Sequence, residues 1–120
     1  GMFLPVQKAA IAALTGPLDM VKTQCGLYQQ RRDALCGGLR SIGWNVPDSH
    51  GSMFVWAPIP EKYAKSMDFC LDLVEKSGVL CTPGSSFGPL GEGYVRFALT
   101  LPPERIADAV KSIKESGILD

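Results

Sequence analysis

The residue with the clearest capacity for chemistry is Arg96, which interrupts the apolar run YVRFALT at 94–100. The composition of this run is typical of a strand, in which side chains alternate between two faces, so Arg96 is expected on the face opposite Val95 and Phe97. A guanidinium matches a carboxylate with two parallel, charge-assisted hydrogen bonds. The position therefore suits a carboxylate-binding arginine. The alternative is an ordinary solvated arginine, or one paired with a nearby acid such as Glu92.

Ahead of this strand, the segment TPGSSFGPLGEG at 82–93 is rich in glycine, which invites comparison with phosphate-binding loops. A Walker loop needs a Gly-Lys pair followed by Ser or Thr and must open a helix, whereas this segment contains no lysine and leads into a strand. The dinucleotide fingerprint also requires a following helix, and GPLGEG at 88–93 has the reverse glycine spacing. The segment is therefore predicted to shape a connection rather than to bind phosphate.

Metal and thiol chemistry have little basis in the sequence. There is one histidine, His50, and four cysteines that form no CxxC pair: Cys25, Cys36, Cys70 and Cys81. No metal-ligand spacing can be assembled locally from these residues. Cys25 and Cys70 fall on apolar helical stripes and Cys81 falls in an expected strand, where a free cysteine behaves as a small hydrophobe. We expect no metal site and reduced core thiols, with disulfide or catalytic roles as the alternative.

The elements that must position Arg96 follow from periodicity and from Gly and Pro punctuation. They are a short helix at 5–14, a long helix from 17 to 42 capped by Gly43, a strand at 52–58, a helix from 67 to 78, strands at 79–82 and 94–100, and a helix from about 103 to 113. In the long helix, six residues predict one apolar face along its whole length: Val21, Cys25, Tyr28, Leu35, Leu39 and Ile42.

These elements predict an α+β domain of two layers, in which a small sheet of three to four strands is covered by helices in the order ααβαββα. The 120 residues are enough for one hydrophobic core and too few for two. The first two helices precede any strand, and the long helix exceeds what so small a sheet needs to cover it. Residues 1–43 are therefore expected to link this domain to something larger.

The charge balance narrows the classes of partner. Twelve basic and twelve acidic residues cancel, so no nucleic acid partner is expected. The longest apolar runs, such as MFVWAPI at 53–59, are far shorter than the roughly 20 residues of a membrane-spanning helix. The N-terminal residues also lack the basic flank and apolar core of a secretory leader. These features favour a cytoplasmic protein without a membrane partner.

Three segments together resemble the C-terminal part of class I/II (fold type I) pyridoxal-phosphate-dependent aminotransferases: PGSSFGPLGEGYVRFALT at 83–100, GSMFVWAPIP at 51–60 and YQQRRDAL at 28–35. The resemblance implies that residues 1–120 form the small, C-terminal domain of such an enzyme. It also implies that Arg96 grips the α-carboxylate of an amino-acid or 2-oxo-acid substrate. The complete enzyme would be a homodimer that uses pyridoxal 5'-phosphate.

The sequence departs from the family pattern in one respect that matters for catalysis. The family's cofactor lysine follows a serine by three residues, and none of the seven lysines here has Ser or Thr at that spacing. The chain alone is therefore expected to bind no cofactor, to contribute no catalytic residue and to be an inactive fragment, with the large domain as its missing partner. Two alternatives stay open, a stand-alone carboxylate-binding module and an assembly module without catalysis. The substrate amino acid also stays open.

Overall fold

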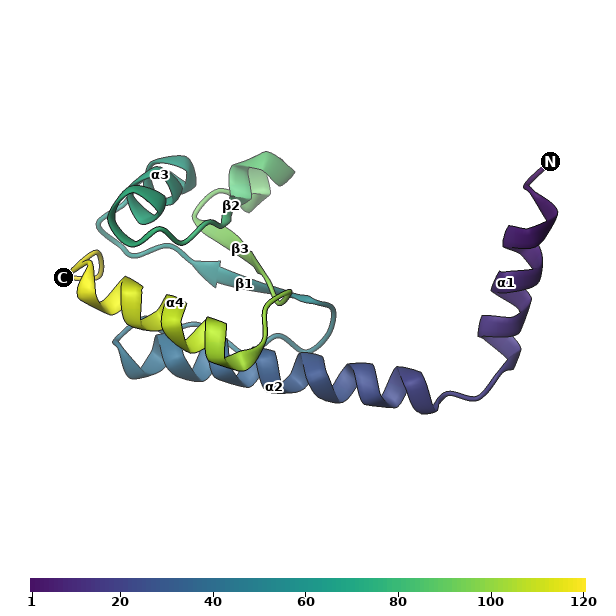
Figure 1. Ribbon diagram of the computed structural model, residues 1–120. Coiled ribbons are helices and arrows are strands. Elements are labelled where there is room, and N and C mark those ends of the chain that lie inside the picture. The colour runs from purple at the N-terminus through teal and green to yellow at the C-terminus, as the bar shows by residue number, and fades with distance from the viewer.

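The computed structural model describes residues 1–120 and confirms the predicted α+β class and element order (Figure 1). The helices are α1 (Leu4–Thr15), α2 (Asp19–Ser41), α3 (Ser66–Ser77) and α4 (Pro103–Glu115). The strands are β1 (Phe54–Pro58), β2 (Thr82–Pro83) and β3 (Tyr94–Ala98). Two short 3₁₀ helices, η1 (Gly84–Phe87) and η2 (Pro89–Gly91), lie between β2 and β3.

The three strands form one antiparallel sheet in the order β1-β3-β2, with β3 in the centre. In the register, Trp56 and Thr82 lie on either side of Arg96, and Val55 lies opposite Phe97. Val55 and Phe97 are buried whereas Trp56 is exposed, so one sheet face forms the core and the other is open. The alternation predicted for β3 is confirmed, and it places Arg96 on the open face.

Helices α2, α3 and α4 contribute to a single hydrophobic core on the buried face, with α2 and α4 side by side. Trp44 lies at its centre, where its ring meets Phe69 and Phe97 edge to face at centroid distances of 5.2 and 5.8 Å. Its indole N–H donates to the Pro58 carbonyl at 2.8 Å. The hydrogen bond satisfies the single polar atom of an otherwise apolar side chain, which is why a tryptophan can be buried here.

The turn that delivers Trp44 to the core is a Schellman motif at the end of α2. The N–H of Trp44 donates to the Leu39 carbonyl at 3.0 Å, and the N–H of Gly43 donates to the Arg40 carbonyl at 3.1 Å. Gly43 has φ +94°, a left-handed conformation that glycine adopts without a steric cost. The predicted cap at Gly43 is confirmed.

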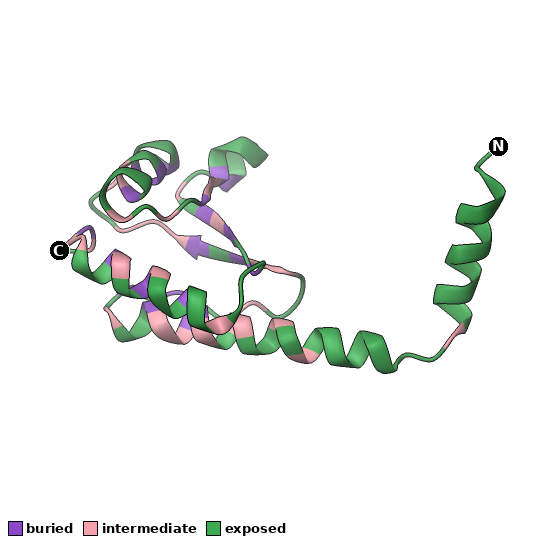
Figure 2. Cartoon of the chain, viewed as in Figure 1, coloured by how far each residue is buried: buried purple, intermediate pink, exposed green.

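Helix α1 and the first half of α2 project from the body of the domain as an N-terminal arm (Figure 2). No residue of α1 is buried, and the side chains of Leu14 and Met20 are 83% and 81% exposed. The radius of gyration is 17.4 Å, against about 13.5 Å for a compact domain of this length. The apolar face predicted along the whole long helix is therefore buried only in its second half. Leu35 is buried, but Val21 has no chain to pack against.

Two smaller predictions also need correction. β2 covers only Thr82–Pro83 instead of 79–82, and Cys81 is buried in the segment before it. The strand therefore begins three residues later than predicted, and it stops at Pro83, which lacks an N–H and cannot donate to a ladder. Cys25 is exposed on the arm rather than in the core, because its helical stripe has no partner there.

None of the helices combines the length and the apolarity that crossing a bilayer requires.

Candidate functional site

The open face of the sheet is centred on Arg96, on the middle strand. The pairing register places Trp56 of β1 and Thr82 of β2 beside it, so the arginine has a neighbouring strand on each side. The strand pairing fixes the backbone at this position, and the side chain is half-buried. The guanidinium therefore projects from the most constrained part of the sheet.

Two aromatic rings enclose the guanidinium. The Cζ atom of Arg96 lies 4.1 Å from the centroid of the Phe54 ring and 4.5 Å from that of Phe87. These are cation–π distances, at which the positive charge is attracted to the face of each ring. Phe87 also meets Trp56 at 5.7 Å, and Trp56 stacks on Tyr94 at 5.8 Å. The guanidinium is thus part of an aromatic cluster on the open face.

No acidic side chain pairs with Arg96, and none of its side-chain nitrogens makes a hydrogen bond within the chain. Its Nε atom is buried without a partner, the sole such side-chain atom in the structure. The acid considered as a partner, Glu92, instead accepts the backbone N–H groups of Ser66 at 2.6 Å and Gly93 at 2.9 Å. These two bonds hold the pKa of Glu92 below its ordinary value. The pairing of Arg96 with Glu92 is therefore excluded, and the guanidinium can accept an external anion.

The glycine-rich segment 84–93 is a compact platform rather than an irregular loop. Its two 3₁₀ helices meet where the backbones of Gly84 and Gly91 touch, because a Cβ built on either residue would overlap the carbonyl oxygen of the other. The segment is tied to α3 through Ser66, whose hydroxyl accepts the Ser85 N–H at 3.3 Å. The prediction that this segment shapes a connection is consistent with this geometry, and Phe87 is the side chain that it presents to Arg96.

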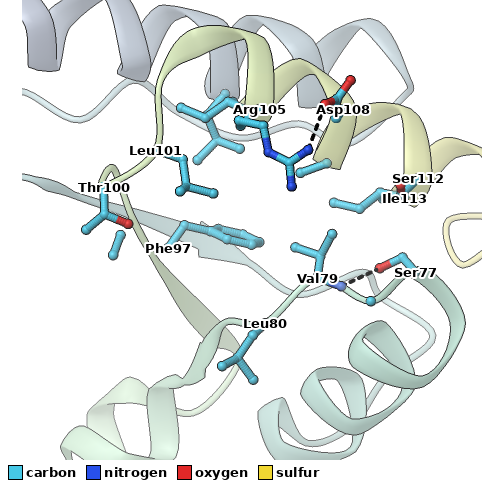
Figure 3. Close-up of a pocket in the computed structure, with 15 residues that line it drawn as sticks. Ser77, Val79, Leu80, Phe97, Thr100, Leu101, Arg105, Asp108, Ser112 and Ile113 are labelled. Atoms are coloured by element: carbon cyan, nitrogen blue, oxygen red, sulfur yellow. Dashed lines mark hydrogen bonds and ion pairs between the residues drawn. The ribbon is translucent and has the colours of Figure 1, made fainter.

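A separate groove of about 490 Å³ lies between α4, the end of β3 and residues 77–80 (Figure 3). Its wall is mostly apolar and includes Phe97. The charged groups at its rim, Arg105 and Asp108, are 3.4 Å apart and neutralise each other. Arg96 does not line this groove. Because the groove offers no unpaired charge for a ligand, we place the candidate site at Arg96.

A second hollow of about 570 Å³ lies between α2 and residues 49–53, beside Arg32 and His50. The guanidinium of Arg32 is 2.7 Å from the carboxylate of Asp33 and also donates to the Ser49 carbonyl at 3.3 Å. Its charge and donors are therefore already matched within the chain. The hollow therefore offers a ligand no unpaired positive charge from Arg32.

Sequence reasoning identified Arg96 and its face but missed the residues that enclose it. Phe54 precedes Trp56 by two residues in the predicted strand and so shares its face, which was a usable signal. The register that brings Phe54 to the guanidinium is not encoded in either strand alone. Phe87 lies in a segment with no periodicity, and nothing in the sequence marked it or the contact between Ser66 and Glu92.

Comparison with known proteins identifies a family that this sequence matches. Residues 3–113 match the family described as aminotransferase class I and II. Over 118 residues the chain is 46% identical to an LL-diaminopimelate aminotransferase of Halothermothrix orenii, a match that covers 98% of this chain and 30% of that relative.

Solved structures agree with the sequence match. The substrate-bound BacF structure from Bacillus subtilis superposes with a TM-score of 0.89 at 31% identity, over 98% of this chain and 30% of that one. An alanine aminotransferase from Pyrococcus furiosus superposes with a TM-score of 0.85 at 30% identity, over 92% of this chain and 29% of that one. The chain therefore spans about 30% of the length of the proteins it resembles.

Proposed function

This chain belongs to the class I and II aminotransferase family, and from that premise we propose that it forms the C-terminal part of an amino-acid aminotransferase in which Arg96 binds the substrate α-carboxylate. Residues 1–120 would be the small domain of that enzyme. Residues 1–43 would connect it to the large domain, for which the exposed apolar arm provides a surface. The complete enzyme would act as a homodimer on an amino acid and a 2-oxo acid.

The observation that carries this proposal is the unpaired guanidinium on the open face. Arg96 is enclosed by the rings of Phe54 and Phe87 and has no acidic partner in the chain. Ring faces leave the in-plane N–H groups of a guanidinium free, and these are the groups that pair with a carboxylate. A substrate approaching this face would therefore meet an oriented, unpaired donor fork.

The family uses pyridoxal phosphate, which supplies the chemistry at the substrate Cα when it is bound. The residues of this chain do not fit the covalent site for that cofactor. The open face presents no lysine; its side chains are Phe54, Trp56, Pro58, Thr82, Tyr94, Arg96 and Ala98. We assign cofactor binding to the part of the enzyme that this chain does not span. The chain's own task is to bind and orient the carboxylate.

For the substrate, LL-diaminopimelate is the first candidate to test. The 46% identity to the Halothermothrix orenii enzyme, over nearly the whole chain, supports this choice. The structural similarity does not discriminate, because an alanine aminotransferase superposes almost as well as BacF. The choice among amino acids therefore rests on sequence similarity.

A chimeric enzyme tests the proposal. This chain would replace the matching segment of the Halothermothrix orenii enzyme, and transamination of LL-diaminopimelate would be measured. We expect the chimera to be active and the Arg96→Ala chimera to lose most of its kcat/KM, whereas Arg105→Ala, which removes an exposed arginine of α4, keeps it. Equal activity of the Arg96→Ala and Arg105→Ala chimeras would contradict the carboxylate role.

The exposed arm favours a second candidate, an assembly module without catalysis. Its apolar side chains include Phe3, Leu14 and Met20, and exposed apolar patches mark interaction surfaces. Supplying the rest of the relative's chain as a separate protein separates the candidates. Recovered transamination supports the enzyme, association without activity supports the assembly module, and binding of an amino acid by this chain alone supports a stand-alone carboxylate binder.

A further inference from the structure

A buried serine joins the start of α3 to both ends of the segment that carries Phe87. Ser66 is the only polar residue in the buried set, with no exposed surface. Its backbone N–H donates to the Glu92 carboxylate at 2.6 Å, and its hydroxyl accepts the Ser85 N–H at 3.3 Å. The two hydroxyls of Ser66 and Ser85 are also 3.2 Å apart. One fixed point in the core therefore anchors the segment on both sides of Phe87.

Phe87 depends on these anchors for its position. Phe87 is 51% exposed, and its aromatic and cation–π partners are Trp56 and Arg96 on the open face. Such a ring has little packing of its own to hold it. Its place over the guanidinium is therefore set by the backbone that carries it, and that backbone is held by Ser85 on one side and Glu92 on the other.

The plane of the Arg96 guanidinium has no hydrogen bond to fix it, because the buried Nε makes none. The ring faces of Phe54 and Phe87 are the contacts that remain. Phe54 belongs to a paired strand, whereas Phe87 belongs to a connection between strands. Of the two rings, Phe87 is the one whose position can be lost without breaking the sheet.

We infer that Glu92 is a positioning residue for Arg96, an inference that rests on the proposed function. Glu92 holds the segment 84–93 to Ser66 and so keeps the Phe87 ring over the guanidinium. The ring in turn fixes the plane of the guanidinium that binds the carboxylate. Bidentate pairing needs that plane, since both N–H groups must point at the two carboxylate oxygens together. If Phe87 moved away, the guanidinium could rotate against the ring of Phe54. It would keep its positive charge, but its two N–H groups would no longer point together at a carboxylate.

The Nε–H group of Arg96 supplies a direct spectroscopic readout in this chain. We would record ¹H–¹⁵N spectra of the arginine side chains and assign Arg96 by the loss of its signal in Arg96→Lys. A proton between two ring faces is shifted upfield, and a buried N–H exchanges slowly with water. In Glu92→Ala we expect the signal to move toward that of a free arginine and its exchange to speed up at least about tenfold. Phe87→Leu should produce the same change.

Matched variants separate positioning from general loss of structure. Glu92→Gln retains one amide oxygen, which can accept both N–H groups as Oε1 does in the wild type, and should keep the Arg96 signal close to that of the wild type. Glu75→Ala, which removes an exposed acid of α3 with no bonded partner, should leave it unchanged. The side-chain signal of Arg31, which donates to the Leu99 carbonyl at 3.0 Å, reports whether the fold is intact. If Glu92→Ala does not fold, Ser66→Ala tests the other anchor of the same segment, because it removes the acceptor of the Ser85 N–H and leaves the backbone bond to Glu92.

In the active chimera, Glu92→Ala should raise KM for the amino acid about tenfold, the size expected when a charge-assisted hydrogen bond is weakened, with a smaller effect on kcat. The inference is overturned if Glu92→Ala and Ser66→Ala leave the Arg96 signal unchanged while Phe87→Leu moves it. Its failure is distinguishable from that of the proposed function. If Arg96→Ala leaves the activity of the chimera unchanged but Glu92→Ala still shifts the Arg96 signal, the carboxylate role is rejected and the positioning role of Glu92 stands.

Discussion

The guanidinium carbon of Arg96 lies 4.1 Å from the centre of the Phe54 ring, on the sheet face opposite the hydrophobic core. Removing the side chain loses this contact and its counterpart with Phe87, yet it also removes a buried Nε that has no acceptor. The two effects oppose each other, so we expect Arg96→Ala to lower the free energy of unfolding by no more than about 1 kcal/mol. Urea unfolding of the chain measures this.

Substitution of Arg96 should lower the activity of the chimera far more than it lowers the stability of the chain. In the chimera, Arg96→Lys is expected to recover little kcat/KM, because an ammonium group cannot reproduce a planar fork. Steady-state kinetics on both variants checks this. A lysine variant with nearly wild-type kcat/KM would return Arg96 to a structural role.

The isolated chain should form no stoichiometric adduct with pyridoxal phosphate. None of its seven lysines has Ser or Thr three residues before it, and none lies on the open face. Borohydride reduction followed by peptide mass spectrometry should find sparse modification spread over surface lysines. Full modification of a single lysine would show that the chain builds a cofactor site of its own.

The N-terminal arm should make the chain self-associate as its concentration rises, since α1 buries none of its apolar side chains. Light scattering from micromolar to millimolar concentration measures the mass. Leu14→Glu should reduce the association, whereas Leu90→Glu, at a 98% exposed residue far from the arm in sequence, should not. A strict monomer at millimolar concentration would count against an interaction role for the arm.

Acid should weaken the fold partly through Glu92. The N–H groups of Ser66 and Gly93 hold its pKa below the ordinary value of 4.5 in the folded state. A depressed folded pKa contributes stability that is fully present above the unfolded value and is lost as the pH falls through the folded value. We expect unfolding experiments below pH 4.5 to show a shallower loss of stability for Glu92→Gln than for the wild type. Glu75→Gln, the matched control, should follow the wild type.

Thiol labelling should divide the four free cysteines into one accessible and three protected residues. Cys25 is exposed on α2, whereas Cys36, Cys70 and Cys81 are buried, and burial raises the pKa of each of these three thiols. Ellman's reagent at neutral pH should therefore modify Cys25 quickly and the others only in denaturant. Rapid labelling of two or more cysteines in the wild type, or of any cysteine in Cys25→Ser at the same pH, would contradict this assignment.

The parts of the fold that sequence predicted correctly are those with local causes. The cap at Gly43 follows from one residue's conformational freedom, and the face of Arg96 follows from alternation within a single strand. The apolar stripe of α2 is also a local pattern. Whether it is covered depends on chain elsewhere, which is why Leu35 is buried and Val21 is not.

The surroundings of Arg96 have causes that no local pattern contains. Phe54 reaches the guanidinium through the register between two strands about 40 residues apart in the chain. Phe87 reaches it through a segment folded by backbone contact and by bonds to α3. The sequence was therefore enough to place the Arg96 guanidinium on its sheet face, whereas its contacts with Phe54 and Phe87 could be found only in the structure.

The meeting of Gly84 and Gly91 has a consequence for how this segment can vary. The Cβ of either residue would occupy the other's carbonyl oxygen, and a Cβ on Gly84 would also lie 2.6 Å from the Tyr94 carbonyl oxygen. An alanine at Gly84 already forces the two turns apart, so a second alanine at Gly91 adds little to the destabilisation. The two glycines therefore form one epistatic unit, and a lineage that replaces Gly84 loses the selective reason to keep Gly91.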